Sequence, residues 1–148
     1  MGILKLFPLP AMPAKPTVST LCPCCKHRNY ADCCGSFHAG ENAPSAEILM
    51  RSRYSAYVFG LESYLLTTWH VSTRPQTLDL EQDTNTRWLG LEIKRHMSTG
   101  PESAIVEFVA RYKIAGRAQR LHEISRFLRE DGRWYYLDGE FPEKGGRK

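Results

Sequence analysis

All five cysteines of this 148-residue chain lie in one short stretch, Leu21 to Gly35, which reads LCPCCKHRNYADCCG. Thiolates are good ligands for zinc, which is borderline-soft and prefers four sulfur or nitrogen ligands in a tetrahedron. Two cysteines flank Pro23, which stiffens a tight turn. The adjacent pair Cys33 and Cys34 requires a bend in the backbone, and Gly35 supplies conformational freedom directly after it. The stretch therefore predicts a closed, structural metal site with no open position for a catalytic water.

The same stretch resembles a known zinc knuckle, the SEC-C motif, which is named from the C-terminal tail of the SecA translocation ATPase. The resemblance rests on Cys22-Pro-Cys24, Tyr30 and Cys33-Cys34-Gly35. The sequence departs from the motif because Cys25-Lys26-His27 stand where Gly-Ser-Gly is usual, so we expect the small, flexible turn to be lost and Cys25 to be a spare thiol. The resemblance implies structural Zn²⁺ with the ligands Cys22, Cys24, Cys33 and Cys34.

Three alternatives remain open for this stretch. Two of the cysteines could form a disulfide, although clustered cysteines in a reducing compartment favour a metal. Cys25 could have a redox or persulfide role, because the neighbouring basic side chains lower the pKa of a thiol. His27 or His38 could also replace one of the cysteines as a ligand.

The first twenty residues predict a flexible, proline-rich leader. Prolines at positions 8, 10, 13 and 16 interrupt the apolar core that a signal peptide requires, and no apolar run reaches the length of a membrane span. We therefore expect a cytoplasmic protein. The formal net charge of +4 is partly due to a basic tail at residues 142–148 and is too small to establish nucleic-acid binding.

Two helices are expected after a polar loop. Ser45 can cap a helix over Ala46–Phe59, and Gly60 fits its C-terminal stop. This helix is apolar around most of its circumference, with only Arg51 and Ser55 on a narrow solvent-exposed edge. Arg53 falls between two apolar arcs, so we expect a carboxylate on one of the strands to be its partner, with binding of a ligand as the alternative role. A second helix is expected over residues 61–70.

Antiparallel strands are expected in the second half of the chain. The patterns predict strands over residues 87–96, 104–114, 121–130 and 133–139, with a Gly100-Pro101 turn, a short basic turn at residues 116–120 and a hairpin at Asp131-Gly132. This hairpin would place Ser125 opposite Asp138 and Phe127 opposite Tyr136. One face would then mix aromatic rings, carboxylates and a hydroxyl, which suits a cavity lining: Glu123, Ser125, Phe127, Trp134, Tyr136 and Asp138.

Two helices followed by a curved antiparallel sheet resemble the cone-shaped α+β fold of nuclear transport factor 2-like domains. The phrases LMRSRYSAY, TWH, WLGL, EFVARY, LHEISRF and DGRWYY together resemble the bacterial YchJ family over about residues 21–141. The resemblance implies a knuckle at residues 21–38 joined to a cone-shaped domain at residues 44–141. It implies no established activity.

The cone interior supplies candidates for a ligand pocket. His122 and Glu123 are adjacent on a strand and point to opposite faces, so they form no simple dyad. The candidates are Arg53, Tyr54, Tyr57, Trp69, His70, Glu107, Glu123, Ser125, Tyr136 and Asp138.

Three hypotheses of function follow. The first is a zinc-binding adaptor, whose knuckle presents the basic rim of Lys26, His27 and Arg28 to a protein partner. The second is a small-molecule binder or enzyme with isomerase-, dehydratase- or hydrolase-like acid–base chemistry in the cone. The third is RNA or ribosome binding. Cone-shaped domains often dimerise through the sheet, but nothing in the sequence decides the oligomeric state.

Overall fold

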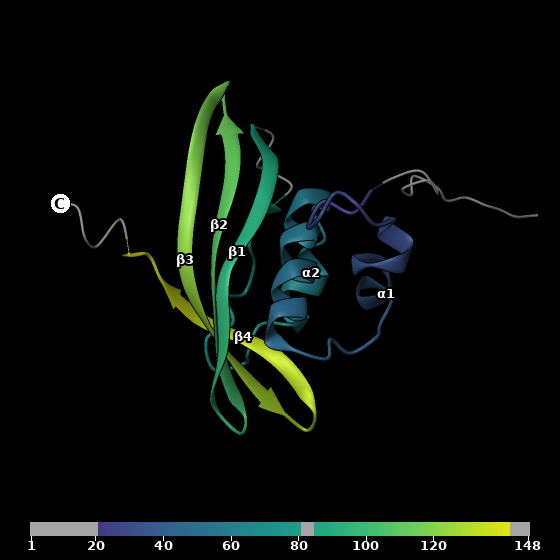
Figure 1. Cartoon of the computed structure of the whole chain (residues 1–148), viewed down its shortest axis with the longest axis vertical. Helices are drawn as coiled ribbons and strands as arrows, with labels where there is room; N and C mark the ends of the chain where they lie inside the picture. Colours follow the sequence, from purple (N-terminus) through teal and green to yellow (C-terminus); the bar gives the residue numbers. More distant parts are fainter. Residues whose placement is uncertain (1–20, 81–84, 143–148) are drawn as a thin grey trace, which may run out of the picture.

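The protein is a curved antiparallel sheet with a central helix on one face and a small cysteine-rich unit on the far side of that helix (Figure 1). The computed structural model describes residues 21–80 and 85–142. The predicted leader and most of the predicted basic tail therefore lie outside the described residues. In the cysteine-rich unit, a 3₁₀ turn, η2 (Tyr30–Asp32), precedes the short helix α1 (Cys34–His38).

Helix α2 (Ala46–Phe59) begins and ends as the sequence predicts. The Ser45 hydroxyl accepts a hydrogen bond of 3.2 Å from the Ile48 amide, which caps the first turn. Gly60 ends the helix in the left-handed region, at φ 73°. The following helix α3 (Glu62–Thr67) is shorter than the predicted segment at residues 61–70.

The sheet contains four strands in the order β1-β2-β3-β4: β1 (Thr86–Gly100), β2 (Ser103–Ile114), β3 (Arg117–Glu130) and β4 (Arg133–Glu140). Two strand predictions are too short. β1 continues to Gly100 through bulges, and β3 begins at Arg117 because Ala115 and Gly116 both have positive φ, at 51° and 82°, in a two-residue hairpin. The predicted hairpin at Asp131-Gly132 is confirmed.

The predicted β3–β4 register is correct near the turn and wrong beyond it. Phe127 pairs with Tyr136 as expected. A register shift between Arg126 and Phe127 then skips one β4 residue, so Arg126 pairs with Asp138 and Ser125 pairs with Gly139. Because a shift of one residue reverses the face of each following side chain, Asp138 lies on the outer face of the sheet.

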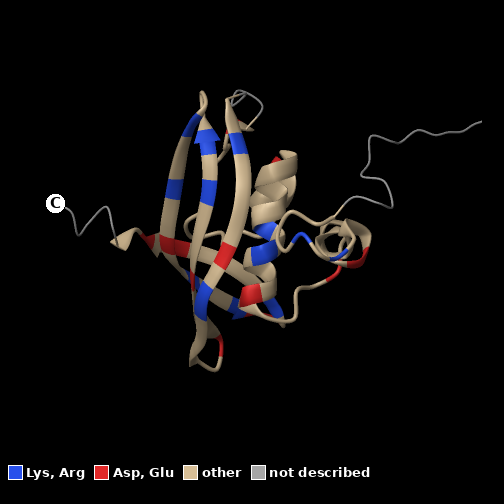
Figure 2. Ribbon diagram, turned by 45° about the horizontal axis from the view of Figure 1, so that its top comes forward, with Lys and Arg blue, Asp and Glu red and all other residues tan. Residues whose placement is uncertain are grey.

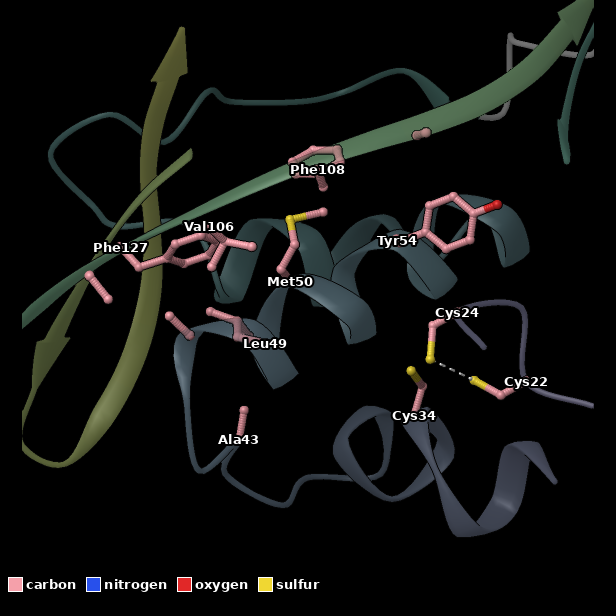
Figure 3. Close-up of a cluster of buried hydrophobic side chains, with 13 residues drawn as sticks. Cys22, Cys24, Cys34, Ala43, Leu49, Met50, Tyr54, Val106, Phe108 and Phe127 are labelled. Atoms are coloured by element: carbon pink, nitrogen blue, oxygen red, sulfur yellow. Dashed lines mark hydrogen bonds between the residues drawn. The ribbon is translucent and has the colours of Figure 1, made fainter. Parts of the chain in front are cut away.

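The core forms where α2 meets the inner face of the sheet. In Figure 3, Leu49 and Met50 of α2 point toward Phe127 and Phe108, Tyr54 lies further along the same helix, and all five side chains are buried. The buried cysteines belong to the same cluster, so the cysteine-rich unit and the sheet pack against α2 from two sides. Among the described residues, no helix is long and apolar enough to span a membrane.

Candidate metal centre and cavity

Residues 21–29 form a tight hairpin that holds the first pair of cysteines. Leu21 bridges Asn29, and the Cys22 carbonyl accepts a hydrogen bond of 2.8 Å from the Lys26 amide. Lys26 has a φ of 65°, in the left-handed region, and its Nζ donates to the Leu89 carbonyl at 2.8 Å. The expected loss of the turn is therefore wrong. The backbone keeps it without glycine, and the lysine side chain ties it to β1.

The second pair of cysteines lies where η2 passes into α1. Cys33 has φ −131° and ψ −114°, which is the bend that the adjacent cysteines require. Gly35 has a different role from the one expected. It is helical, and a Cβ at this position would lie only 2.7 Å from the Tyr30 carbonyl oxygen, so the glycine permits close packing of Tyr30 and supplies no unusual dihedral angle.

The folding of these two segments brings four sulfurs together. The Sγ atoms of Cys22, Cys24, Cys33 and Cys34 all lie within 4.8 Å of one another. The Cys22–Cys24 and Cys24–Cys33 sulfur distances are both 3.7 Å, and a tetrahedron with metal–sulfur bonds of about 2.3 Å has edges of about 3.8 Å. The cluster could therefore hold a metal ion. Figure 3 shows three of these sulfurs converging between α2 and α1.

The close packing of the cysteine side chains gives neighbouring thiols different pKa values. Interaction with Cys22 holds the pKa of Cys24 and of Cys34 above the usual value, while Cys24 and Cys34 together lower the pKa of Cys22. The cluster thus favours one thiolate and opposes further ionisation. A divalent cation at its centre would reverse this opposition, because it stabilises the thiolate form of every ligand.

Helix α2 forms the back wall of the cysteine cluster. The Ser55 hydroxyl lies 3.4 Å from the Cys22 sulfur and donates to the Cys34 sulfur at 3.3 Å. Ser55 is fully buried, so its predicted place on a solvent-exposed edge is wrong. Arg51 Nη1 donates to the Cys24 carbonyl at 3.4 Å, while its Nε forms an ion pair of 3.0 Å with Glu47.

His38 connects the cysteine-rich unit to α2. Its Nδ1 accepts from the Tyr30 hydroxyl at 2.5 Å, and its Nε2 donates to the Ser52 carbonyl at 2.8 Å. Burial lowers the pKa of His38, which favours this neutral form. Both ring nitrogens are engaged in hydrogen bonds and His38 lies outside the four-sulfur group, so the geometry does not support it as a ligand. All five cysteines are free thiols, and Cys25 is half-buried beside the cluster.

A cavity of about 330 Å³ lies between α2 and the inner face of the sheet. Seven of the ten candidate residues line it: Arg53, Tyr54, Tyr57, Trp69, Glu123, Ser125 and Tyr136. The sequence reasoning missed the apolar remainder of the lining: Met50, Trp88, Phe108, Ala110, Leu121 and Phe141. Alternation along the strands is a signal that could have identified the four strand residues among them, Trp88, Phe108, Ala110 and Leu121.

Glu123 is the acidic group of the cavity and is only 7% exposed. The hydroxyls of Ser125 and Tyr136 each donate to its Oε2 at 2.8 Å, which leaves Oε1 without a hydrogen bond among the described residues. Burial raises the pKa of Glu123. The carboxylate packs directly on the Gly139 backbone, where any Cβ would collide with it. The bulge that displaces Asp138 therefore also creates the space for Glu123.

Arg53 is the buried cation of the cavity, and the expected carboxylate partner is wrong. Its Nη1 donates to the Leu65 carbonyl at 2.8 Å and to the Thr68 hydroxyl at 2.7 Å. The guanidinium carbon lies 5.1 Å from the ring centre of Trp69 and 4.6 Å from that of Tyr136, distances typical of cation–π contacts. Burial lowers the pKa of Arg53, and Glu123 acts on it only through space.

Three candidates lie outside the cavity lining. Glu107 accepts from Arg95 at 2.8 Å and contacts His122 Nε2 at 2.7 Å on the outer face. The placement of His122 and Glu123 on opposite faces is confirmed. Of the two remaining candidates, Asp138 forms an ion pair with Arg126, and His70 Nε2 lies 2.8 Å from the Glu130 carboxylate.

A cysteine cluster with metal-binding geometry, joined to a helix-covered curved sheet, defines a two-part α+β protein. The comparisons with known proteins agree with this description. Residues 45–139 match the family model described as the middle NTF2-like domain of YchJ. The chain therefore belongs to the YchJ family, as its sequence phrases predict.

Relatives extend the match over the cysteine-rich unit. The chain is 53% identical to a UPF0225 protein of Xanthomonas campestris over 130 residues, which cover 87% of this chain and 97% of the relative. A SEC-C motif protein from Rhodopseudomonas palustris has a solution structure with a TM-score of 0.72 and 33% identity, covering 82% of this chain and 98% of its own. The crystal structure of a SEC-C motif protein from Psychrobacter arcticus gives 0.71 and 31%, covering 82% of both chains.

Proposed function

We propose that this protein binds a small, largely apolar ligand carrying an anionic group in the cavity, and that zinc at the cysteine cluster holds the fold together. The observation that carries the first part is the burial of Arg53 and Glu123 beside one cavity without a direct hydrogen bond between them. Buried charges are usually paired with an opposite charge. Because Arg53 and Glu123 do not pair with each other, each can still form a hydrogen bond or ion pair with a ligand in the cavity.

The lining indicates the class of ligand. Seven of the thirteen lining residues are aromatic, including residues of α2, β1, β2 and β4, and they favour a flat, apolar body. At about 330 Å³, the cavity is near the lower end of the range of about 300–1,000 Å³ that is usual for ligand pockets. Arg53 favours a carboxylate or a similar anion, since charge-assisted bonds to guanidinium are among the strongest in proteins.

Glu123 supplies the second polar contact. Its raised pKa and unbonded Oε1 suit it to donate a proton to the ligand or to accept one from it. Isomerase-, dehydratase- or hydrolase-like chemistry would need such a group within reach of the ligand. Binding is the part of this hypothesis that the geometry supports, and catalysis stays a prediction.

Zinc is the metal that best suits the cysteine cluster. Four thiolates at tetrahedral spacing favour zinc over the harder ions that prefer oxygen ligands. The cluster would be closed and structural, with Ser55 donating a hydrogen bond to one ligating sulfur as an outer contact.

The adaptor hypothesis gains no specific support from the basic rim of the knuckle. Lys26 donates to the Leu89 carbonyl, and Arg28 donates to the Asp32 carbonyl at 2.8 Å. Both of these cations therefore already form hydrogen bonds within the chain. A protein partner for the knuckle therefore stays a prediction.

Calorimetric titration with 1-naphthoate and its neutral analogue 1-naphthylmethanol tests ligand binding. We expect the carboxylate to bind at least about tenfold more tightly than the alcohol, and Arg53→Met to abolish this preference. Arg126→Met, at an exposed arginine on the outer face, is the matched control and should leave the preference unchanged. Equal affinity for both compounds, or no binding of either, would overturn the proposal for the cavity. Elemental analysis of the purified protein should give one zinc per chain.

A further inference from the structure

A second cleft, of about 310 Å³, lies where the cysteine-rich unit, α3 and the start of β4 meet. Among the described residues, it shares no lining residue with the cavity between α2 and the sheet. We call it the side cleft. Part of its lining comes from the loop at residues 39–45, which is tan in Figure 2 apart from the stretch at its one charged residue, Glu41. The side cleft is therefore a separate site, formed by the packing of the two parts of the protein.

Two of the rings that line the side cleft are held by contacts within the chain. Tyr64 packs edge-on against His38, with 4.6 Å between the ring centres, and its hydroxyl lies 2.7 Å from the Ser52 hydroxyl. The guanidinium carbon of Arg129 lies 5.3 Å from the ring centre of Trp134, a distance typical of a cation–π contact. Because both rings are fixed before a ligand arrives, they offer a preformed surface to a flat, apolar group.

The two parts of the protein bring opposite charges to the side cleft. Glu41 belongs to the loop of the cysteine-rich unit, and Arg133 is the first residue of β4. Both residues are exposed, and neither has an ion pair among the described residues. Glu130 lies directly opposite Arg133 in the sheet, but its carboxylate lies 2.8 Å from His70 Nε2. One negative and one positive group are therefore both available to a ligand.

The charge of Arg133 acts on the interior of the side cleft. Burial raises the pKa of Tyr64, and the positive charge of Arg133 is among the effects that oppose this rise. Asn42 and Ser63 add an amide and a hydroxyl to the lining, and neither side chain forms a hydrogen bond among the described residues. Such neutral groups can complete the hydrogen bonds of a bound carboxylate or ammonium group.

We propose that the side cleft binds a free amino acid with an aromatic side chain, independently of the cavity. Arg133 pairs with the carboxylate of the amino acid, Glu41 pairs with its ammonium group, and its ring lies against Trp134. A simple anion would meet the carboxylate of Glu41, and a simple cation would meet Arg133. The charge pair therefore favours a zwitterion over either. The volume of about 310 Å³ is at the lower end of the usual range for ligand pockets, which suits so small a ligand.

An NMR titration with L-phenylalanine and two analogues that each lack one charge tests this proposal. Hydrocinnamate lacks the ammonium group, and phenethylamine lacks the carboxylate. We expect L-phenylalanine to bind at least about tenfold more tightly than either analogue, because each loses one charge-assisted interaction. The backbone amides that shift should be those of residues 37–43 and 63–68, which contribute to the side cleft.

Two variants separate the roles of the charges. Arg133→Gln should reduce the affinity for L-phenylalanine at least about tenfold and leave that for phenethylamine unchanged. Glu41→Gln should cause a similar reduction and leave the affinity for hydrocinnamate unchanged. The matched controls Arg126→Gln and Glu92→Gln remove the same charges from exposed positions elsewhere on the sheet and should not alter binding. Thermal unfolding checks that each variant folds.

Four results would overturn the proposal. They are the absence of binding, equal affinity for the three compounds, an equal loss in the controls, and competition between L-phenylalanine and 1-naphthoate. The last result would place the amino acid in the cavity. A failure of 1-naphthoate to bind would leave this test unaffected, because the two sites share no lining residue among the described residues.

Discussion

The cysteine cluster and the cavity lie on opposite sides of the same helix and use buried polar groups in opposite ways. Around the cysteine cluster, His38 has both ring nitrogens in hydrogen bonds, and Ser55 of α2 contacts two sulfurs. In the cavity, Glu123 keeps one unbonded oxygen, and Trp69 Nε1 is a buried N–H without a partner among the described residues. An unmade buried hydrogen bond costs about 1–3 kcal/mol of folding free energy. The polar groups around the cysteine cluster therefore stabilise the fold, whereas the unsatisfied groups of the cavity reduce its stability.

The largest expected effect comes from breaking the cysteine cluster. Cys34→Ser removes one of four sulfurs, so we expect loss of bound metal and a decrease in the free energy of unfolding of at least about 3 kcal/mol, because metal binding and folding are linked. Elemental analysis and denaturant unfolding measure these two effects.

Cys25→Ser is the matched control for this prediction. Cys25 neighbours the cluster but lies outside the four-sulfur group, so metal content and stability should change little. Equal losses in the two variants would contradict the assignment of the four ligands.

A smaller effect is expected from Gly35→Ala. Alanine is favoured over glycine in a helix by about 1 kcal/mol, but its Cβ would lie 2.7 Å from the Tyr30 carbonyl oxygen. We therefore expect the close contact to dominate and the variant to be destabilised by about 1–3 kcal/mol in urea unfolding. A more stable variant would show that α1 shifts freely and that the cysteine-rich unit is less rigid than the comparison implies.

The smallest effect, and the one of opposite sign, is expected in the cavity. Burial raises the pKa of Glu123 above its ordinary value of 4.5, so the native state holds this proton more tightly than the unfolded state. Its contribution to the free energy of unfolding therefore decreases as the pH rises from 4.5 through the raised pKa. Glu123→Gln removes this penalty, so its stability relative to the natural protein should increase with pH.

Glu107→Gln is the control with the reverse sign. Hydrogen bonds from Arg95 and His122 lower the pKa of Glu107, so its stabilising contribution is present at neutral pH and lost as the pH falls through the lowered pKa. This variant should be less stable than the natural protein at neutral pH, and the difference should shrink in acid. If the stability of the two variants, relative to the natural protein, changed with pH in the same direction, the predicted contrast between Glu123 in the cavity and Glu107 on the outer face would be wrong.

Local signals made much of this fold predictable from the sequence. The serine cap and terminal glycine of α2 act within a few residues, as does the Asp131-Gly132 turn. Sequence resemblance supplied the family and the set of four cysteines. These features depend on short-range geometry or on a distinctive spacing.

The features that the sequence did not predict depend on tertiary contacts, that is, on which residues from other elements pack against a given side chain. A helical wheel places Ser55 away from the apolar arcs but does not distinguish water from a cluster of sulfurs. The β4 bulge has no mark in an alternating pattern, yet it moves Asp138 to the outer face and puts Gly139 beneath Glu123. Arg53 was expected to need a carboxylate, whereas a carbonyl, a hydroxyl and two ring faces surround it.

The position of α2 between the cysteine cluster and the cavity also decides where the chain can be cut into parts that fold. The family match begins at residue 45, just before this helix. Yet the Ser52 carbonyl and the Ser55 hydroxyl of this helix bond to the cysteine-rich unit, while Arg53 lines the cavity. A shortened chain starting at residue 45 would expose to water the side of α2 that packs against the cysteine-rich unit. The segment that the family model covers is thus smaller than the unit that packs around α2, and an exchange of either part between relatives should include the helix they share.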